Sequence, residues 1–117
     1  MKVQDFRIGN FVYGVDKFEG VAMPILSIYN DNTICFRPET YAKHYLANEI
    51  KPIELTVEWL QKFGFIYDAI IECWEKDEFR ISKDFVLMDI DIHVELKYVH
   101  RLQNVFFDLK DEELIIY

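Results

Sequence analysis

The sequence of 117 residues contains few of the residues that interrupt folded structure, namely four Gly and three Pro. This scarcity, beside an apolar fraction of 51%, excludes a linker-rich or intrinsically disordered chain. The length fits a single domain, residues 1–117, which can bury a core without disulfide staples. Within it we expect a β-rich half over residues 1–55 and a helix–strands–helix half over residues 56–117.

Cysteine and long apolar runs are also scarce. Cys35 and Cys73 lie far apart and form no C-x-x-C pair, which leaves two interpretations open: buried thiols in a reducing compartment, or a disulfide between them. No apolar run approaches the roughly 18 to 20 residues that span a membrane. The first residues lack the apolar segment of a secretory signal. We therefore expect a soluble, cytoplasmic protein.

Catalytic signatures are absent from the sequence. It has no Gly-rich phosphate loop, no G-x-S-x-G and no H-E-x-x-H. Histidines at positions 44, 93 and 100 are the available partners for the two cysteines, but no signature of nucleophilic catalysis surrounds either thiol. We expect no enzyme and no cofactor.

Residues 89–97 alternate strictly between polar and apolar side chains, which predicts an antiparallel strand with one wet face. Asp89, Asp91 and His93 are residue types that ligate zinc or manganese. The same residues also suit a solvated sheet face whose charges discourage edge pairing. We favour the solvated face and expect no metal.

Positive charge is in deficit, with 13 basic residues against 21 acidic ones and a formal net charge of −8. Such a chain repels phosphate backbones, so direct binding to nucleic acid is not expected. The deficit is uneven, because residues 1–55 carry a net charge of −1 and residues 56–117 a net charge of −7. An electrostatic function is therefore expected in the second half.

The aromatic residues, ten Phe, seven Tyr and two Trp, supply the core of an α+β fold. In the first half, short apolar runs separated by turn residues predict an SH3-like β module, with Pro24 at an edge or bulge. In the second half, Thr56 and Gly64 bound a short helix as its N-cap and its C-terminal stop. We expect one bent antiparallel sheet of six or seven strands and two helices. The expected elements of the second half are a helix at about 57–63, strands at 65–74, 79–82 and 89–97, a helix at about 98–110 and a strand at 114–116.

Aromatic residues in polar surroundings are the first candidates for partner contacts. Phe107 lies beside His100 and Gln103 on the predicted second helix, away from its apolar stripe. It is either a contact residue or a side chain buried against a neighbouring strand. The segment from Tyr41 to Tyr45, which includes His44, raises the same choice between an interface and the core. Tyr41, His44 and Tyr45 are therefore candidate partner-binding residues.

Acidic side chains form the second candidate surface. One group, from Glu72 to Glu78, surrounds a predicted turn, and another follows the second helix at Asp111, Glu112 and Glu113. The acidic surface either mimics phosphates and occupies a basic groove, or is only a solvated face.

Three segments resemble a family of small uncharacterised proteins found in Bacteroidetes genomes, their prophages and other mobile elements. They are FRIGNFV at residues 6–12, PIELTVEWLQKFGF at 52–65, and YVHRLQNVFFDL at 98–109 with EEL at 112–114, and they cover about a third of the chain. The resemblance implies a phage or mobile-element context and brings no catalytic residue with it. Among the matched polar residues, His100, Gln103 and Asn104 are the least explained by packing.

Together these observations predict a non-enzymatic acidic binding protein of phage or mobile-element origin, acting in the host cytoplasm. Its expected partner is a basic host nucleic-acid-binding protein, which it would inhibit stoichiometrically in the manner of an anti-CRISPR or another anti-defence protein. The alternative is a self-associating module, a homodimer formed through Phe107 and the segment from Tyr41 to Tyr45, with no role related to nucleic acid.

Overall fold

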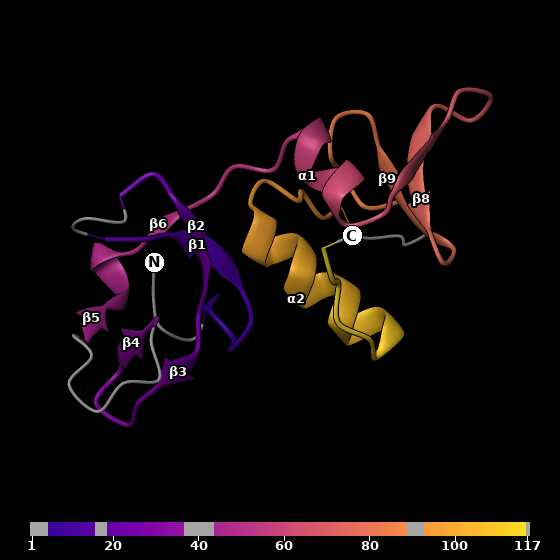
Figure 1. The fold of residues 1–117 in the computed structure, drawn as a ribbon. Helices are drawn as coiled ribbons and strands as arrows, with labels where there is room; N and C mark the ends of the chain where they lie inside the picture. The colour runs from indigo at the N-terminus through magenta and orange to yellow at the C-terminus, as the bar shows by residue number, and fades with distance from the viewer. Residues whose placement is uncertain (1–4, 16–18, 37–43, 89–92, 117) are drawn as a thin grey trace. The chain divides into compact units, whose positions relative to one another are not determined.

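The computed structural model describes most of the chain, namely residues 5–15, 19–36, 44–88 and 93–116. By their contacts the residues fall into two compact units, Met1–Ile53 (unit 1) and Glu54–Tyr117 (unit 2), which we describe separately (Figure 1). Short antiparallel strands are combined with helices, so the predicted α+β class is confirmed. The described strands form three sheets of three strands each, where one larger bent sheet was expected. Strands of two to four residues give each sheet little length to extend before the chain turns.

Unit 1 contains two of these sheets. Pro24 ends a strand at the edge of the first sheet, where its missing N–H costs no ladder hydrogen bond. The turn at 30–32 is present, with Asn32 in the left-handed region at φ 67°. The SH3-like arrangement of these strands stays a prediction. In sheet order the strands are β2 (Ala22–Pro24), β1 (Phe11–Tyr13) and β6 (Lys51–Pro52), then β3 (Ser27–Ile28), β4 (Thr33–Cys35) and β5 (Tyr45–Leu46), and a 3-10 helix, η3 (Ala47–Glu49), precedes β6.

The core of unit 1 gathers side chains from both of its sheets and from the turns between them. Val12 of β1 and Ile34 of β4 are fully buried in it, and Tyr45 of β5 packs against it. Because residues of both sheets contribute to one cluster, strands this short share a core. Its buried residues are Phe6, Val12, Ile25, Ile34, Phe36, Ala47 and Ile50.

Unit 2 begins with helix α1 (Val57–Lys62), whose two ends are capped as the sequence predicts. The Thr56 hydroxyl accepts a hydrogen bond from the Trp59 N–H. At the other end Gly64 has a positive φ of 87°, and its N–H donates to the Gln61 carbonyl. The Phe65 N–H donates to the Leu60 carbonyl, which completes a Schellman motif. Six residues cannot hold a helix by propensity alone, so the buried Trp59 and Leu60 stabilise it.

The third sheet follows, in the order β7 (Ile66–Asp68), β8 (Cys73–Lys76) and β9 (Phe79–Ser82). The predicted continuous strand over 65–74 is wrong, because a turn at 69–72 divides it. The turn between β8 and β9 places both of its central residues, Asp77 and Glu78, at positive φ. This is the requirement of a two-residue type I′ hairpin.

The chain then runs back along β9 before the second helix. The part of the predicted strand 89–97 that the structure describes, from His93 onward, is no regular strand, although Glu95 bridges Val86 and its side chains keep the expected alternation of exposure. Asp89 and Asp91 lie outside the described residues. Helix α2 (Val99–Lys110) is present within one residue of its predicted bounds. The predicted strand at 114–116 is not formed: these residues pair with none of the described strands.

In the part of the chain that the structure describes, neither helix combines the length and the apolar character that crossing a membrane requires.

Candidate protein-binding surface

The most distinctive surface of unit 2 is the hairpin formed by β7 and β8. The register pairs Ile66 with Glu75 and Tyr67 with Trp74. Alternate residues of a strand face opposite sides, so Ile66 and Asp68 share one face with Glu75. On the other face the ring of Tyr67 contacts that of Trp74, with centroids 5.2 Å apart.

The turn at the end of this hairpin is shaped by one carboxylate. Oδ1 of Asp68 accepts hydrogen bonds from the backbone N–H groups of Ile70 (2.9 Å) and Ile71 (3.4 Å). Glu72 takes a positive φ of 51° and leads the chain back into β8. The turn therefore has a defined conformation without glycine or proline, and it projects away from the helices of unit 2 (Figure 1).

This hairpin exposes large apolar side chains that the rest of unit 2 leaves uncovered. Ile70 is 93% exposed and Ile66 is 74% exposed, and Tyr67 and Ile71 are also exposed. Single exposed apolar residues are ordinary on protein surfaces. Several of them on one short hairpin, here called the apolar patch, make it a candidate contact site.

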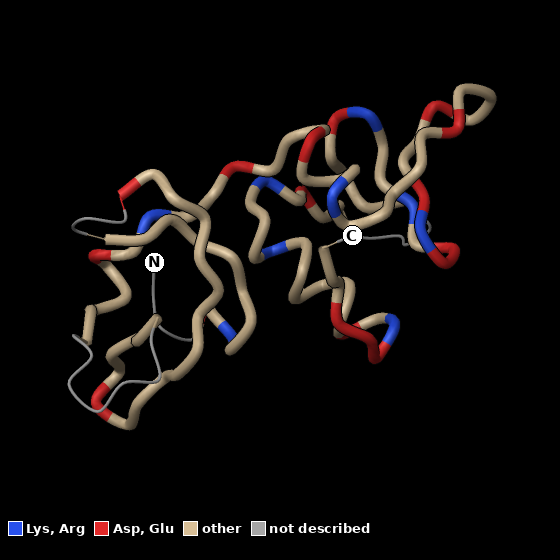
Figure 2. Tube along the Cα trace, viewed as in Figure 1, with Lys and Arg blue, Asp and Glu red and all other residues tan. Residues whose placement is uncertain are grey.

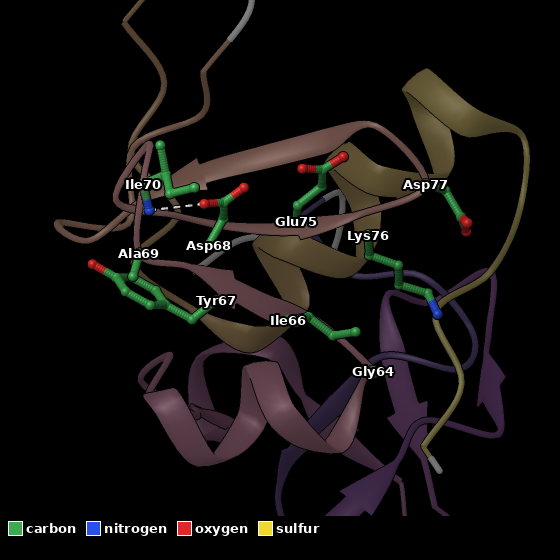
Figure 3. Close-up of a pocket in the computed structure, with 9 residues that line it drawn as sticks. All are labelled: Gly64, Ile66, Tyr67, Asp68, Ala69, Ile70, Glu75, Lys76 and Asp77. Carbon is green, nitrogen blue, oxygen red and sulfur yellow. Dashed lines mark hydrogen bonds between the residues drawn. The ribbon is translucent and has the colours of Figure 1, made fainter.

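A groove of about 640 Å³ runs beside this patch (Figure 3). The carboxylates of Asp68 and Glu75 point to the same side of the hairpin, and Ile66 lies nearer Gly64. Asp77 adds a third carboxylate and Lys76 the only ammonium group among the residues that line the groove. The full lining is Gly64, Ile66, Tyr67, Asp68, Ala69, Ile70, Glu75, Lys76 and Asp77.

Two ion pairs near the groove moderate its negative charge only slightly. Glu75 Oε2 lies 3.5 Å from Arg80 Nε, and Glu72 Oε2 lies 3.5 Å from Lys83 Nζ. Exposed pairs of this kind contribute little energy and are screened by salt. The groove thus combines apolar side chains with an excess of carboxylates.

The predicted contact residues on α2 are placed less favourably for binding. His100 and Gln103 are buried, and the His100 ring stacks on that of Tyr98 with centroids 5.7 Å apart. Asn104 and Phe107 are half-buried. The buried face of α2 follows the spacing of Val99, Leu102, Gln103 and Phe106, so it is rotated toward residues predicted to be polar contacts.

The acidic end of α2 is exposed as expected. Asp111 ends the helix in the left-handed conformation, and its N–H donates to the Phe107 carbonyl (2.8 Å). Asp111, Glu112 and Glu113 are exposed and follow the negative end of the helix dipole. Figure 2 shows acidic residues at this helix end and at the turns of the third sheet.

The predicted tyrosine segment belongs to unit 1 and divides between surface and core. Tyr45 packs on the core, where its ring lies 6.0 Å from that of Phe36. His44 is exposed and stacks on Tyr29, with ring centroids 4.2 Å apart. Tyr41 lies outside the described residues.

A short polar chain lies behind this ring pair. Thr33 Oγ1 donates to Asp31 Oδ1 (2.6 Å) and lies 3.3 Å from His44 Nδ1. The Thr33 hydroxyl lowers the pKa of the Asp31 carboxyl, with smaller contributions from the Thr33 N–H and the His44 charge. All of these groups belong to the β3-β4-β5 sheet of unit 1 or adjoin its strands.

In the described part of the chain the cysteines and the acidic residues form no metal site. Cys35 and Cys73 are both buried, are not joined in a disulfide, and belong to different units. Among the described residues, no group of three or more His, Cys, Asp and Glu side chains is arranged to hold a metal ion. His93 is exposed, with Nε2 at 3.3 Å from Glu95 Oε1.

The groove is the feature that sequence reasoning missed. The sequence of residues 65–74 is typical of one apolar strand. It therefore does not reveal the turn at 69–72 or the exposure of Ile66 and Ile70. The available signal was Asp68, because an aspartate side chain can accept a hydrogen bond from the backbone two residues on and so form an Asx turn. Comparisons of the chain with protein-family models, curated proteins and solved structures found no match.

Proposed function

We propose that this protein is a non-enzymatic binding protein whose acidic unit 2 occupies a basic surface of a protein partner. One observation carries the proposal: the net negative charge belongs entirely to one unit. Residues 54–117 carry fifteen acidic and seven basic side chains, a net charge of −8, whereas residues 1–53 carry six of each. Charge concentrated in this way raises a local potential that steers a basic partner.

The placement of the carboxylates supports the proposal. They are exposed at the turns of the third sheet and at the end of α2, where they do not contribute to a core (Figure 2). A second hollow of unit 2, of about 350 Å³, is lined by three acidic side chains, those of Glu54, Asp84 and Glu95, beside Lys97 and three apolar residues. Negative groups therefore face solvent on several parts of the unit.

The specific partner that we propose is a host nucleic-acid-binding protein, which would be inhibited by stoichiometric occupation. A channel built to hold phosphates is strongly basic, and exposed carboxylates can compete for it. The resemblance to proteins of phages and mobile elements supports an anti-defence role, of which an anti-CRISPR protein is the concrete form. In this proposal the protein has no catalytic step and needs no cofactor.

The test is capture from a Bacteroidetes host lysate by the tagged full chain, at low and at high salt. We expect one basic protein to be retained by the tagged chain at low salt and eluted at high salt. In a separate competition assay, the purified chain should displace this protein from DNA. The double variant Glu112→Lys, Glu113→Lys should weaken capture, whereas Glu19→Lys, a charge reversal in unit 1, should not. Capture that is insensitive to salt and unchanged in the Glu112→Lys, Glu113→Lys variant would contradict the electrostatic mechanism.

A second candidate function is self-association through the C-terminal part of unit 2. Leu109, Ile115 and Ile116 are exposed apolar residues of this part, and Phe107 is half-buried. Sedimentation of the wild type and of Phe107→Asp at several concentrations separates the two functions. A monomer at every concentration excludes self-association, and a dimer abolished by Phe107→Asp would replace the first proposal.

A further inference from the structure

We infer that the β7–β8 groove binds an extended protein segment in which Lys or Arg side chains alternate with large apolar ones. The inference rests on the proposed function and names the site and the partner chemistry. It does not depend on the acidic end of α2, so the two can fail separately.

The apolar part of the recognition is carried by Ile66 and Ile70. Unit 2 buries Ile81 completely, yet it leaves Ile70 at 93% exposure at the end of the hairpin. The hydrogen bonds from the Ile70 and Ile71 N–H groups to Asp68 fix the turn, so Ile70 is presented by a defined conformation. Covering one such side chain changes an affinity by about tenfold or more.

The charge of the groove selects among possible occupants. The carboxylates of Asp68, Glu75 and Asp77 outnumber the nearby cations, which are Lys76 in the groove and Arg80 at 3.5 Å from Glu75, so the remaining negative charge favours cationic side chains (Figure 3). A second copy of the chain docked groove to groove would bring its own carboxylates against these. An anionic lipid surface would be repelled for the same reason. A basic polypeptide is the occupant that satisfies both the apolar and the charged groups.

The sheet supplies the geometry for an extended segment. In the described part of the chain β7 lies at one edge of its sheet, because the order is β7-β8-β9. An edge strand presents backbone groups that can pair with an added strand. A segment added there would direct every second side chain to the face that carries Ile66 and Glu75. The groove volume of about 640 Å³ lies within the common range for binding pockets.

The experiment uses the isotope-labelled full chain and a synthetic nine-residue peptide in which lysine alternates with isoleucine. Two control peptides replace isoleucine by serine, or lysine by glutamate. We expect amide shifts confined to residues 64–77 with the lysine–isoleucine peptide, and at least tenfold weaker binding of both controls. Equal shifts with the lysine–serine peptide, shifts elsewhere or no shifts would overturn the inference.

Matched variants locate the contact without disturbing the fold. Ile70→Ser and Glu75→Gln should each weaken binding of the lysine–isoleucine peptide. Ile115→Ser removes another exposed isoleucine of the same unit, at 58% exposure, and should leave binding unchanged. An unchanged affinity for Ile70→Ser would overturn the inference, as would a dimer of the wild type that Ile70→Ser abolishes.

The proposed function is measured separately, through salt-sensitive capture by the Glu112→Lys, Glu113→Lys variant. Loss of capture with intact peptide binding in that variant supports the groove as a distinct site. Intact peptide binding by a chain that captures no basic protein would refute the proposed function and leave the groove assignment standing.

Discussion

The two units are similar in length but differ completely in charge. Unit 1 carries equal numbers of acidic and basic residues, whereas unit 2 carries the whole net charge of −8. Unit 1 is β-rich and contains the 3-10 helix η3, and unit 2 combines the third sheet with helices α1 and α2. If acidity served solubility alone, it would not need to be confined to one unit. The excess of carboxylates is therefore a property of unit 2 and not of the chain as a whole.

The largest expected effect tests whether the two units unfold independently of each other. Phe106 is buried in unit 2, with its ring 5.1 Å from that of Phe79 and 6.3 Å from that of Phe65. Phe106→Ala removes these contacts and leaves a cavity, so we expect it to lower the free energy of unfolding by about 3 to 5 kcal/mol. Amide hydrogen exchange should show lost protection concentrated in unit 2. An equal loss of amide protection throughout residues 5–36 would contradict this expectation, because the two units would then unfold together.

The next effect concerns the start of α1. Thr56→Ala removes the hydroxyl that accepts from the Trp59 N–H, and we expect a loss of about 1 kcal/mol in urea unfolding. The backbone N–H of Glu58 and the Thr56 hydroxyl lower the pKa of the Glu58 carboxyl, so the variant should also raise that pKa toward its ordinary value. Thr56→Ser keeps the acceptor and is the control. If Thr56→Ser destabilises α1 as much as Thr56→Ala, the cap is not the cause.

A smaller and opposite effect is expected at the β8–β9 turn of unit 2. Glu78 has a φ of 68°, which costs an L-residue about 1 kcal/mol. Glu78→Gly relieves this strain and should raise the melting temperature by a few degrees. Glu78→Ala removes the same charge but keeps the Cβ, so it should give no comparable gain. An equal rise of the melting temperature in both variants would show that charge repulsion, and not backbone strain, lowers the stability of unit 2.

The smallest effect lies in unit 1 and depends on pH. Because the Thr33 hydroxyl lowers the pKa of Asp31, its hydrogen bond favours the folded state above the ordinary carboxyl pKa. This contribution is lost as the pH falls through the lowered pKa. Carboxyl resonances followed by NMR should show that Thr33→Val raises the pKa of Asp31. His44→Ala should raise it less, because the imidazole charge is the weaker cause. The reverse order would assign the shift to charge.

Local signals determined which parts of the fold could be predicted. Thr56 and Gly64 mark the ends of α1, because the cap and the Schellman motif require those residue types and otherwise only nearby backbone groups. The strand 79–82 was also correct, since its buried and half-buried side chains alternate over its full length. The β7–β8 turn was missed because its signal is the side chain of Asp68 and not a glycine or proline.

The candidate site was less predictable than the fold. Exposure at the end of α2 followed from the charge of Asp111 to Glu113. Burial of His100 and Gln103 did not follow from the sequence, because the orientation of a helix depends on what packs against it. The groove depends on Ile66 and Glu75 being opposite each other, and that pairing exists only once the register of the hairpin is known.

The two cysteines give each unit its own chemical reporter. Cys35 of β4 and Cys73 of β8 are both fully buried, and each is the single cysteine of its unit. A thiol this deeply buried reacts with an alkylating reagent only when the surrounding structure opens. The alkylation rate of each cysteine, resolved by peptide mass, therefore gives the opening free energy of its own unit in an unmodified chain. Occupation of the groove should slow the reaction of Cys73 and leave that of Cys35 unchanged.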